Sequence, residues 1–128
     1  MNKLIIDITN EKIFLMIITK DDIYNITKEN TKINYEKLTL ILKDFLNSNN
    51  LKLEDIQKIY VNRGPGSFAG IRNSLSIVKA INVARNIDYY CYSLEDFKDQ
   101  KDVKYEDIPN LCDKFKIKKN LIKPIYLS

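Results

Sequence analysis

Hydrophobic positions in the first 27 residues fall into three short runs rich in β-branched side chains, at 3–8, 12–19 and 22–27. Polar pairs at 10–11 and 20–21 separate them, a spacing typical of an antiparallel meander. The first run is apolar on both faces up to Asp7, which indicates a strand buried on both sides. Further strands are expected at about 58–62 and 88–92.

Two segments follow helical periodicity instead. The first, 34–48, should be capped by Asn34 and end at 48–50, with Leu40 on its polar side. Its apolar face comprises Tyr35, Leu38, Ile41, Leu42, Phe45 and Leu46.

The second helix, from Ser67 or Phe68 to Asn86, is apolar around much of its girth. One stripe is expected to pack on the sheet, and the other on the first helix or another protein. The two stripes are Ile71, Leu75 and Val78, and Ile77, Ile81 and Ala84. Gly70 and Ser74 form a small-residue ridge that would let a second helix approach closely.

All three glycines lie within residues 64–70, between the fourth strand and the second helix. Arg63 and Arg72, two of only three arginines, flank this loop. A glycine turn that opens a helix can hold an anion on its backbone N–H groups. The spacing is neither that of a dinucleotide-binding fold nor that of a P-loop, so the pattern favours a tight turn with close packing over phosphate contact.

Composition excludes several kinds of catalytic and metal site. The chain has 128 residues, a net charge of +4 and no histidine. The length suits one domain, and the lack of histidine excludes Ser-His dyads, His-ligated metals and imidazole bases. Cys91 and Cys112 are expected to be reduced thiols. No apolar stretch approaches membrane-spanning length, so we expect a cytoplasmic protein with no membrane partner.

The C-terminal part has a different character. Residues 96–107 are charged and weakly periodic, and lysines recur at 114, 116, 118, 119 and 123. RNA binding through these lysines is an alternative to a solvated surface, but the interspersed apolar residues favour a segment that covers the sheet with its lysines exposed. Those apolar residues are Phe115, Ile117, Leu121 and Ile122. The end, 124–128, is expected to dock as an edge strand.

As a full string, the loop and helix start closely resemble the motif of the bacterial tRNA threonylcarbamoyladenosine biosynthesis family TsaB/YeaZ. The residues that carry the resemblance are Arg63, Gly64, Pro65, Gly66, Ser67, Phe68, Ala69, Gly70, Ile71 and Arg72, then Leu75, Ser76, Ile77 and Lys79. The similarity extends to 4–9, 53–56, 93–95 and 124–127. It covers about residues 1–97 and the extreme C-terminus.

The resemblance implies an α/β half-fold of the actin-like ATPase (RNase H-like) superfamily. This is a mixed five-stranded sheet, three antiparallel strands and then parallel ones, with two main helices and a short C-terminal extension. It also implies a non-catalytic partner of a TsaD-like transferase, which modifies the N6 of the adenosine beside the tRNA anticodon. A TsaE-like P-loop ATPase is the third component, and tRNA is met only indirectly. Contact with the transferase is expected through Tyr35, Leu38, Leu42, Gly70, Ser74, Leu75, Val78 and Ile81. Whether the isolated chain is a monomer or a homodimer stays open.

Departures from the family pattern qualify these expectations. The stretch after 97 is too short for the family's second subdomain, so we expect a minimised form with 98–128 packed on 1–97. Ala69 replaces the family's usual threonine, and the turn at 7–10 lacks the glycine of ATP-binding relatives. We therefore expect no cofactor on this chain alone, with ATP or ADP and Mg²⁺ at the complex interface.

The alternative function is a nucleotide- or phosphate-binding enzyme or sensor that uses the loop Gly64–Gly70. Asp7, Thr9 and Ser67 would then contact the anion, with Asp7 holding a metal-bound water. A strand-end carboxylate that caps nearby N–H groups is the favoured interpretation of Asp7.

Overall fold

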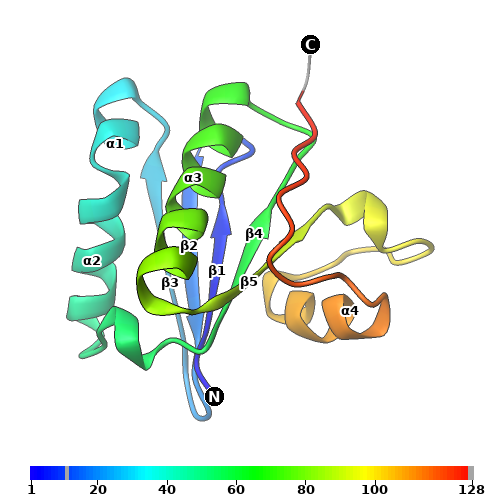
Figure 1. Ribbon diagram of the computed structural model, residues 1–128, viewed down its shortest axis with the longest axis horizontal. Helices are drawn as coiled ribbons and strands as arrows, with labels where there is room; N and C mark the ends of the chain where they lie inside the picture. The colour runs from blue at the N-terminus through cyan, green and yellow to red at the C-terminus, as the bar shows by residue number, and fades with distance from the viewer. Residues whose placement is uncertain (11, 127–128) are drawn as a thin grey trace.

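A computed structural model describes residues 1–10 and 12–126, and has an α/β architecture built on one five-stranded sheet (Figure 1). Glu11 in the first expected turn, and Leu127 and Ser128 in the expected last strand, lie outside the described residues. The strands are β1 (Lys3–Asp7), β2 (Lys12–Ile18), β3 (Ile23–Glu29), β4 (Lys58–Asn62) and β5 (Asp88–Tyr92).

The sheet has the order β3-β2-β1-β4-β5. β1 pairs antiparallel with β2, with Lys3 opposite Ile18, and parallel with β4, with Leu4 opposite Ile59. β2 and β3 are antiparallel, whereas β4 and β5 are parallel. The predicted mixed sheet and the central position of the first strand are thus confirmed.

The first helical segment is broken into α1 (Lys32–Glu36) and α2 (Leu38–Ser48). Its predicted cap was wrong. Thr31 is the N-cap, because its hydroxyl accepts from the Asn34 N–H at 3.1 Å, and the Asn34 side chain donates to the Glu29 carbonyl. The end at Ser48 and the exposure of Leu40 are as predicted.

α3 (Phe68–Arg85) begins and ends within a residue of the prediction. Most of its second stripe contacts the core of this chain and not another protein. Leu75 and Ile81 are both buried, at 4% and 8% exposed, and Ile77 is partly buried in the same core. The helix therefore packs the first stripe and most of the second inside this chain, whereas Ala84, the last residue of the second stripe, is exposed.

Most residues expected to contact a partner are core residues. Those buried in this chain are Leu38, Leu42, Gly70, Ser74, Leu75, Val78 and Ile81. These side chains are covered by one another and by the sheet, so they offer little exposed surface to a partner in the structure described. Tyr35 is half-buried. The ridge of Gly70 and Ser74 faces inward, and Ser74 donates to the Ile71 carbonyl.

Each face of the sheet has its own apolar cluster. Alternate residues of β1, Leu4 and Ile6, face α2 and α3, whereas Ile5 faces the C-terminal segment. That segment contains two 3-10 helices, η2 (Leu94–Asp96) and η3 (Tyr105–Asp107), and the helix α4 (Ile108–Lys114). η1 (Leu53–Asp55) precedes β4. The extension covers this face over β1, β2, β4 and β5, whereas alternate residues of β3 stay exposed.

The C-terminal tail, residues 116–126, runs beside β5 and past the start of α3 (Figure 1). It makes single bridges, Lys119 with Tyr90 and Tyr126 with Gly66, rather than the expected edge strand. Ile117 is half-buried as predicted, but Leu121 and Ile122 are 49% and 39% exposed, so their expected burial was wrong.

Both thiols, Cys91 and Cys112, are free and buried, as expected for reduced cysteines. Within residues 1–10 and 12–126, none of the helices combines the length and apolar character needed to cross a membrane.

Candidate functional site

The glycine loop joins β4 to α3 and is packed against the end of β1. Gly64 has φ +112°, a conformation that L side chains rarely adopt, and a Cβ there would lie 2.0 Å from the Ile125 carbonyl oxygen. A Cβ on Gly70 would lie 2.0 Å from the Ile8 carbonyl oxygen, and one on Gly66 2.5 Å from that of Thr9. The glycines are thus required by close backbone packing within the chain.

Ser67 ends the loop and caps α3. Its hydroxyl accepts from the Gly70 N–H at 3.3 Å, and its own N–H donates to the Thr9 carbonyl at 3.1 Å. Two of the N–H groups that could cradle an anion at this helix start are therefore engaged inside the protein. Pro65, Phe68 and Arg72 point outward and are exposed.

Arg63 fixes the loop to two distant segments. Its Nη2 donates to Asp96 Oδ1 at 2.6 Å, its Nε donates to the other carboxylate oxygen at 3.3 Å, and its Nη1 donates to the Lys123 carbonyl at 3.1 Å. The side chain is only 11% exposed, so this forked pair is mostly desolvated. The arginine at this position thus serves the planar, multi-donor role for which Arg differs from Lys.

Asp7 lies buried at the end of β1 and accepts four hydrogen bonds. Oδ1 accepts from the Thr9 N–H and hydroxyl at 3.0 and 2.7 Å, and Oδ2 accepts from Asn62 Nδ2 at 3.1 Å and the Tyr105 hydroxyl at 2.8 Å. Asn62 Oδ1 in turn accepts from the Gly64 N–H. The capping interpretation of Asp7 is confirmed, and the carboxylate also anchors the glycine loop and the C-terminal segment.

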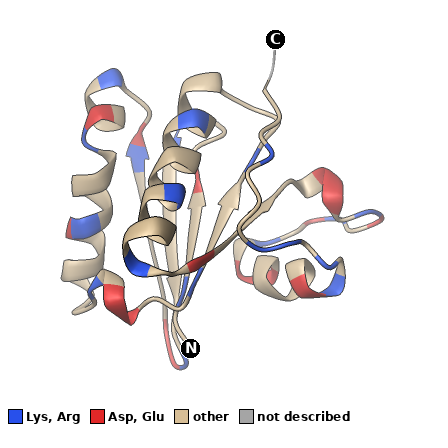
Figure 2. Cartoon of the chain, viewed as in Figure 1, with Lys and Arg blue, Asp and Glu red and all other residues tan. Residues whose placement is uncertain are grey.

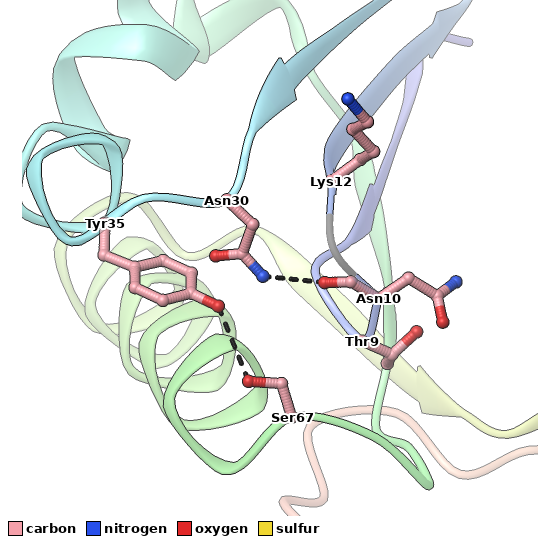
Figure 3. Close-up of a pocket in the computed structure, with 6 residues that line it drawn as sticks. All are labelled: Thr9, Asn10, Lys12, Asn30, Tyr35 and Ser67. Carbon is pink, nitrogen blue, oxygen red and sulfur yellow. Dashed lines mark hydrogen bonds between the residues drawn. The ribbon is translucent and has the colours of Figure 1, made fainter.

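A shallow cleft of about 840 Å³ opens between the β1–β2 turn and the start of α3 (Figure 3). Asn30 donates to the Asn10 carbonyl across it, and the Tyr35 hydroxyl lies 3.5 Å from that of Ser67. Among the described residues that line the cleft, Lys12 is the one that carries a charge, and it is paired with Glu29. The cleft brings Thr9 and Ser67 together, and its other described lining residues offer hydroxyls and amides.

A second cleft of about 400 Å³ lies over the ends of β1, β4 and β5 and contains Asp7, Asn62 and Tyr92. Burial raises the pKa of Tyr92 and of Tyr105, and the nearby Asp7 carboxylate raises both further. Both phenols therefore stay protonated at neutral pH. The Tyr105 hydroxyl donates to Asp7, whereas the buried Tyr92 hydroxyl has no hydrogen-bond partner among residues 1–10 and 12–126.

The two thiols are also unreactive at neutral pH. Burial raises the pKa of Cys91 to about 12, and burial with the nearby Asp113 raises that of Cys112 to about 12. Within residues 1–10 and 12–126, no three His, Cys, Asp or Glu side chains are arranged to hold a metal ion. With Asp7 already engaged by four donors, these residues do not fit a Mg²⁺ site.

Sequence reasoning missed Asn62 and Tyr105, which complete the network around Asp7. Asn62 carried a signal, because it is a polar residue at the end of an otherwise apolar strand. Tyr105 carried none, since its role depends on a contact with Asp7 across 98 positions of sequence. Nucleotide contact by Asp7, Thr9 or Ser67 stays a prediction.

Comparison with known proteins identifies the family. The sequence model of the family described as TsaD, tRNA N6-adenosine threonylcarbamoyltransferase, matches residues 29–93, just over half of the chain. The chain belongs to the TsaD family. The match begins at the last residue of β3 and continues past β5, so it includes the glycine loop, whose motif first indicated the family.

Individual relatives confirm the TsaB/YeaZ resemblance within the TsaD family. The chain is 29% identical over 75 residues to the tRNA threonylcarbamoyladenosine biosynthesis protein TsaB of Buchnera aphidicola subsp. Baizongia pistaciae. That alignment covers 59% of this chain and 34% of the relative.

Solved structures confirm the fold. YeaZ from Pseudomonas aeruginosa matches with a TM-score of 0.66 at 20% identity, over 72% of this chain and 43% of that one. A second structure, described by its similarity to the peptidase YeaZ from the same organism, matches over the same shares with a TM-score of 0.67. The chain thus spans about a third to two fifths of the length of these relatives.

Proposed function

We propose that this TsaD-family chain is a non-catalytic partner subunit in synthesis of N6-threonylcarbamoyladenosine in tRNA, and that it binds and activates a TsaD-like transferase. The curated relative is named for this pathway. The observation that carries the proposal is the contrast between the glycine loop, whose groups are engaged in internal packing, and an unpartnered apolar surface on the helices.

This surface, the outer helical face, comprises Ile33, Leu40, Ala80, Val83 and Ala84. Ile33 of α1 is 62% exposed, Leu40 of α2 is 52% exposed and Val83 of α3 is 74% exposed. Ala80 and Ala84, one turn apart, add small side chains that permit close approach of another helix. Exposed apolar positions on α1, α2 and α3 favour a helix-to-helix interface.

The outer helical face replaces the contact residues expected from the sequence. The proposal keeps the helices as the interface but moves the contact from the buried stripes to the opposite sides of α2 and α3. Binding of a TsaE-like ATPase, of ATP or ADP with Mg²⁺ at the interface, and self-association of the chain stay predictions within this proposal.

A binding measurement with Leu40→Glu tests the assignment. We expect the variant to keep the circular dichroism spectrum of the wild type, because Leu40 lies outside the core, and to bind a TsaD-like protein at least tenfold more weakly, because a charge would be desolvated at an apolar contact.

Thr27→Glu, an exposed change of equal charge on β3, serves as the matched control and should bind normally. Wild-type affinity in the Leu40 variant, or equal loss in both variants, would place the interface elsewhere.

A further inference from the structure

Charge is distributed unevenly along this chain. Residues 56–87 and 114–126 together contain ten of the 21 basic residues and none of the 17 acidic residues. The rest of the chain therefore carries 11 basic and 17 acidic residues, so a chain of modest net charge has one strongly positive part. Such a separation creates a field that orients and attracts anionic partners.

The fold brings the two basic segments together. The Asn82 side chain on α3 donates to that of Asn120 in the tail at 3.3 Å, and the rings of Phe68 and Tyr126 lie 4.7 Å apart. Figure 2 shows the basic residues of α3 and of the tail on the same side of the molecule. The two segments thus meet at both ends of α3.

Helical spacing decides which α3 residues face the tail. Phe68, Arg72 and Lys79 follow each other at intervals of four and seven residues and share a flank with Asn82. The basic flank of α3 is therefore the flank that borders the tail. Arg72, Lys79, Lys118, Lys119 and Lys123 together form what we term the tail-side basic surface, and all five are exposed.

Acidic groups neutralise little of this surface. Lys119 lies 3.5 Å from Asp88, and within residues 1–10 and 12–126 no ion pair involves the other four. The surface ends in an aromatic cluster, where the Arg72 guanidinium lies 5.9 Å from the centre of the Phe68 ring and Phe68 contacts Tyr126. Phe68 and Tyr126 are 53% and 41% exposed, so their faces are accessible to a ligand.

We propose that the tail-side basic surface binds the phosphate backbone of a folded RNA, with the Phe68–Tyr126 cluster positioned to stack on an unpaired base. Exposed lysines outside ion pairs supply phosphate contacts, and aromatic rings beside an arginine are a common platform for splayed bases. Identification of this RNA as tRNA rests on the proposed function.

An acidic protein is the competing occupant, and composition argues against it. Lysine is depleted in the cores of protein interfaces, whereas clustered lysine and arginine along a helix and an adjoining strip are typical of nucleic-acid surfaces. Ile33 and Leu40 of the outer helical face lie on α1 and α2, across α3 from the tail (Figure 1), and remain available to a protein, whereas Val83, one turn from Lys79, borders the tail-side basic surface. A protein partner and an RNA can therefore occupy different surfaces of the chain.

The test uses the full chain alone, with no transferase present, so its outcome is independent of the proposed partner. A fluorescent, in vitro transcribed tRNA with an unmodified adenosine beside the anticodon is titrated at several salt concentrations between about 50 and 200 mM. The test variant replaces Lys79, Lys118 and Lys123 with Gln. The control variant replaces three exposed lysines of other elements, Lys20, Lys28 and Lys32, with Gln and so has the same net charge.

We expect wild-type binding to weaken steeply with salt, and the test variant to bind at least tenfold more weakly with a salt slope smaller by about 2, since each lost phosphate contact removes about 0.7 to 0.9. The control should keep the wild-type slope. No binding by the wild type, or equal losses in the two variants, would overturn the proposal. Displacement of the tRNA by polyglutamate at equal charge concentration would also overturn it, by showing that the surface takes an acidic protein.

Discussion

Replacement of Gly70 by Ala tests whether the glycine loop is shaped by packing on β1. In the first turns of a helix Ala is intrinsically better than Gly by up to about 1 kcal/mol, so propensity alone predicts a more stable protein. The structure predicts the opposite, because the added Cβ would lie 2.0 Å from the Ile8 carbonyl oxygen and 3.0 Å from Ile8 Cγ2.

The size of the effect follows from what must move. A carbon and an oxygen at 2.0 Å are more than about 1 Å too close, and the obstacle is backbone rather than a flexible side chain. Overpacking of this kind costs about 1 to 3 kcal/mol, and moving α3 away from β1 would also break the 3.1 Å bond from the Ser67 N–H to the Thr9 carbonyl, worth about 1 kcal/mol. After the gain in propensity, we expect a net loss of about 1 to 3 kcal/mol.

Urea unfolding followed by circular dichroism measures this loss. The midpoint should fall by about 1 to 2 M with an unchanged slope, given about 1 to 3 kcal/mol per molar urea for small proteins. Ser76→Ala, on the exposed side of the same helix, is the control and should be neutral or stabilising by up to about 0.5 kcal/mol. If Gly70→Ala is stabilising like its control, the close packing we describe does not exist.

Three further predictions concern the core, the arginine anchor and the thiols. Leu75→Glu and Ile81→Glu should both lose the folded circular dichroism spectrum, whereas Val83→Glu keeps it, because only Val83 is exposed; a folded Ile81 variant would restore the idea of a free second stripe. Arg63→Lys should lower the free energy of unfolding by about 1 to 2 kcal/mol and speed amide hydrogen exchange at 119–126, because Lys cannot bond Asp96 and the Lys123 carbonyl together. Unchanged exchange would refute the role of Arg63 in holding the tail. The pKa of each thiol is about 12 in the folded chain against 9.0 in the unfolded chain, so its burial should stabilise the protein fully below pH 9 and by roughly 1 kcal/mol less at pH 10 than at pH 8. Urea midpoints at the two pH values measure this difference. A stability that rises over that range would contradict the burial of the thiols.

Much of the fold was predictable from sequence, because the strongest patterns were local. Strands β4 and β5 match the prediction at both ends, and α3 is delimited by Ser67 at its start and Asn86, with φ 57°, after its end. These boundaries depend on apolar periodicity and on capping residues, which a single sequence displays. The sheet order beyond the meander came from the family resemblance carried by the loop motif.

What failed were predictions that needed tertiary information. The sequence left the second stripe of α3 open between the first helix and another protein, and Leu75 and Ile81 were both expected at a partner contact. In the structure both belong to one core with the sheet and α2, and Ala84 is exposed. The tail was predicted to bury Leu121 and Ile122, yet Ile5, Tyr60 and their neighbours are already covered by α4 and the segment before it. Apolar residues indicate burial only when some face is left to bury them.

The candidate site was predictable only in part. Arg63 and the glycines were singled out correctly, but composition could not distinguish an anion cradle from internal packing, since both require permissive backbone. The difference depends on the distance from the glycines to Ile8 and Thr9, which are more than 50 positions away in sequence. The same holds for Tyr105, which contacts Asp7 through the fold alone.

Reconstitution of tRNA modification tests the central claim most directly. The chain, a TsaD-like protein and unmodified tRNA are combined with the threonylcarbamoyl donor, and threonylcarbamoyladenosine is measured after nuclease digestion. We predict no product with the chain alone, product when the chain and the TsaD-like protein are both present, and loss of that product with Leu40→Glu but not with Thr27→Glu. Product from the chain alone, or an equal yield from the TsaD-like protein without the chain, would contradict a non-catalytic activating subunit.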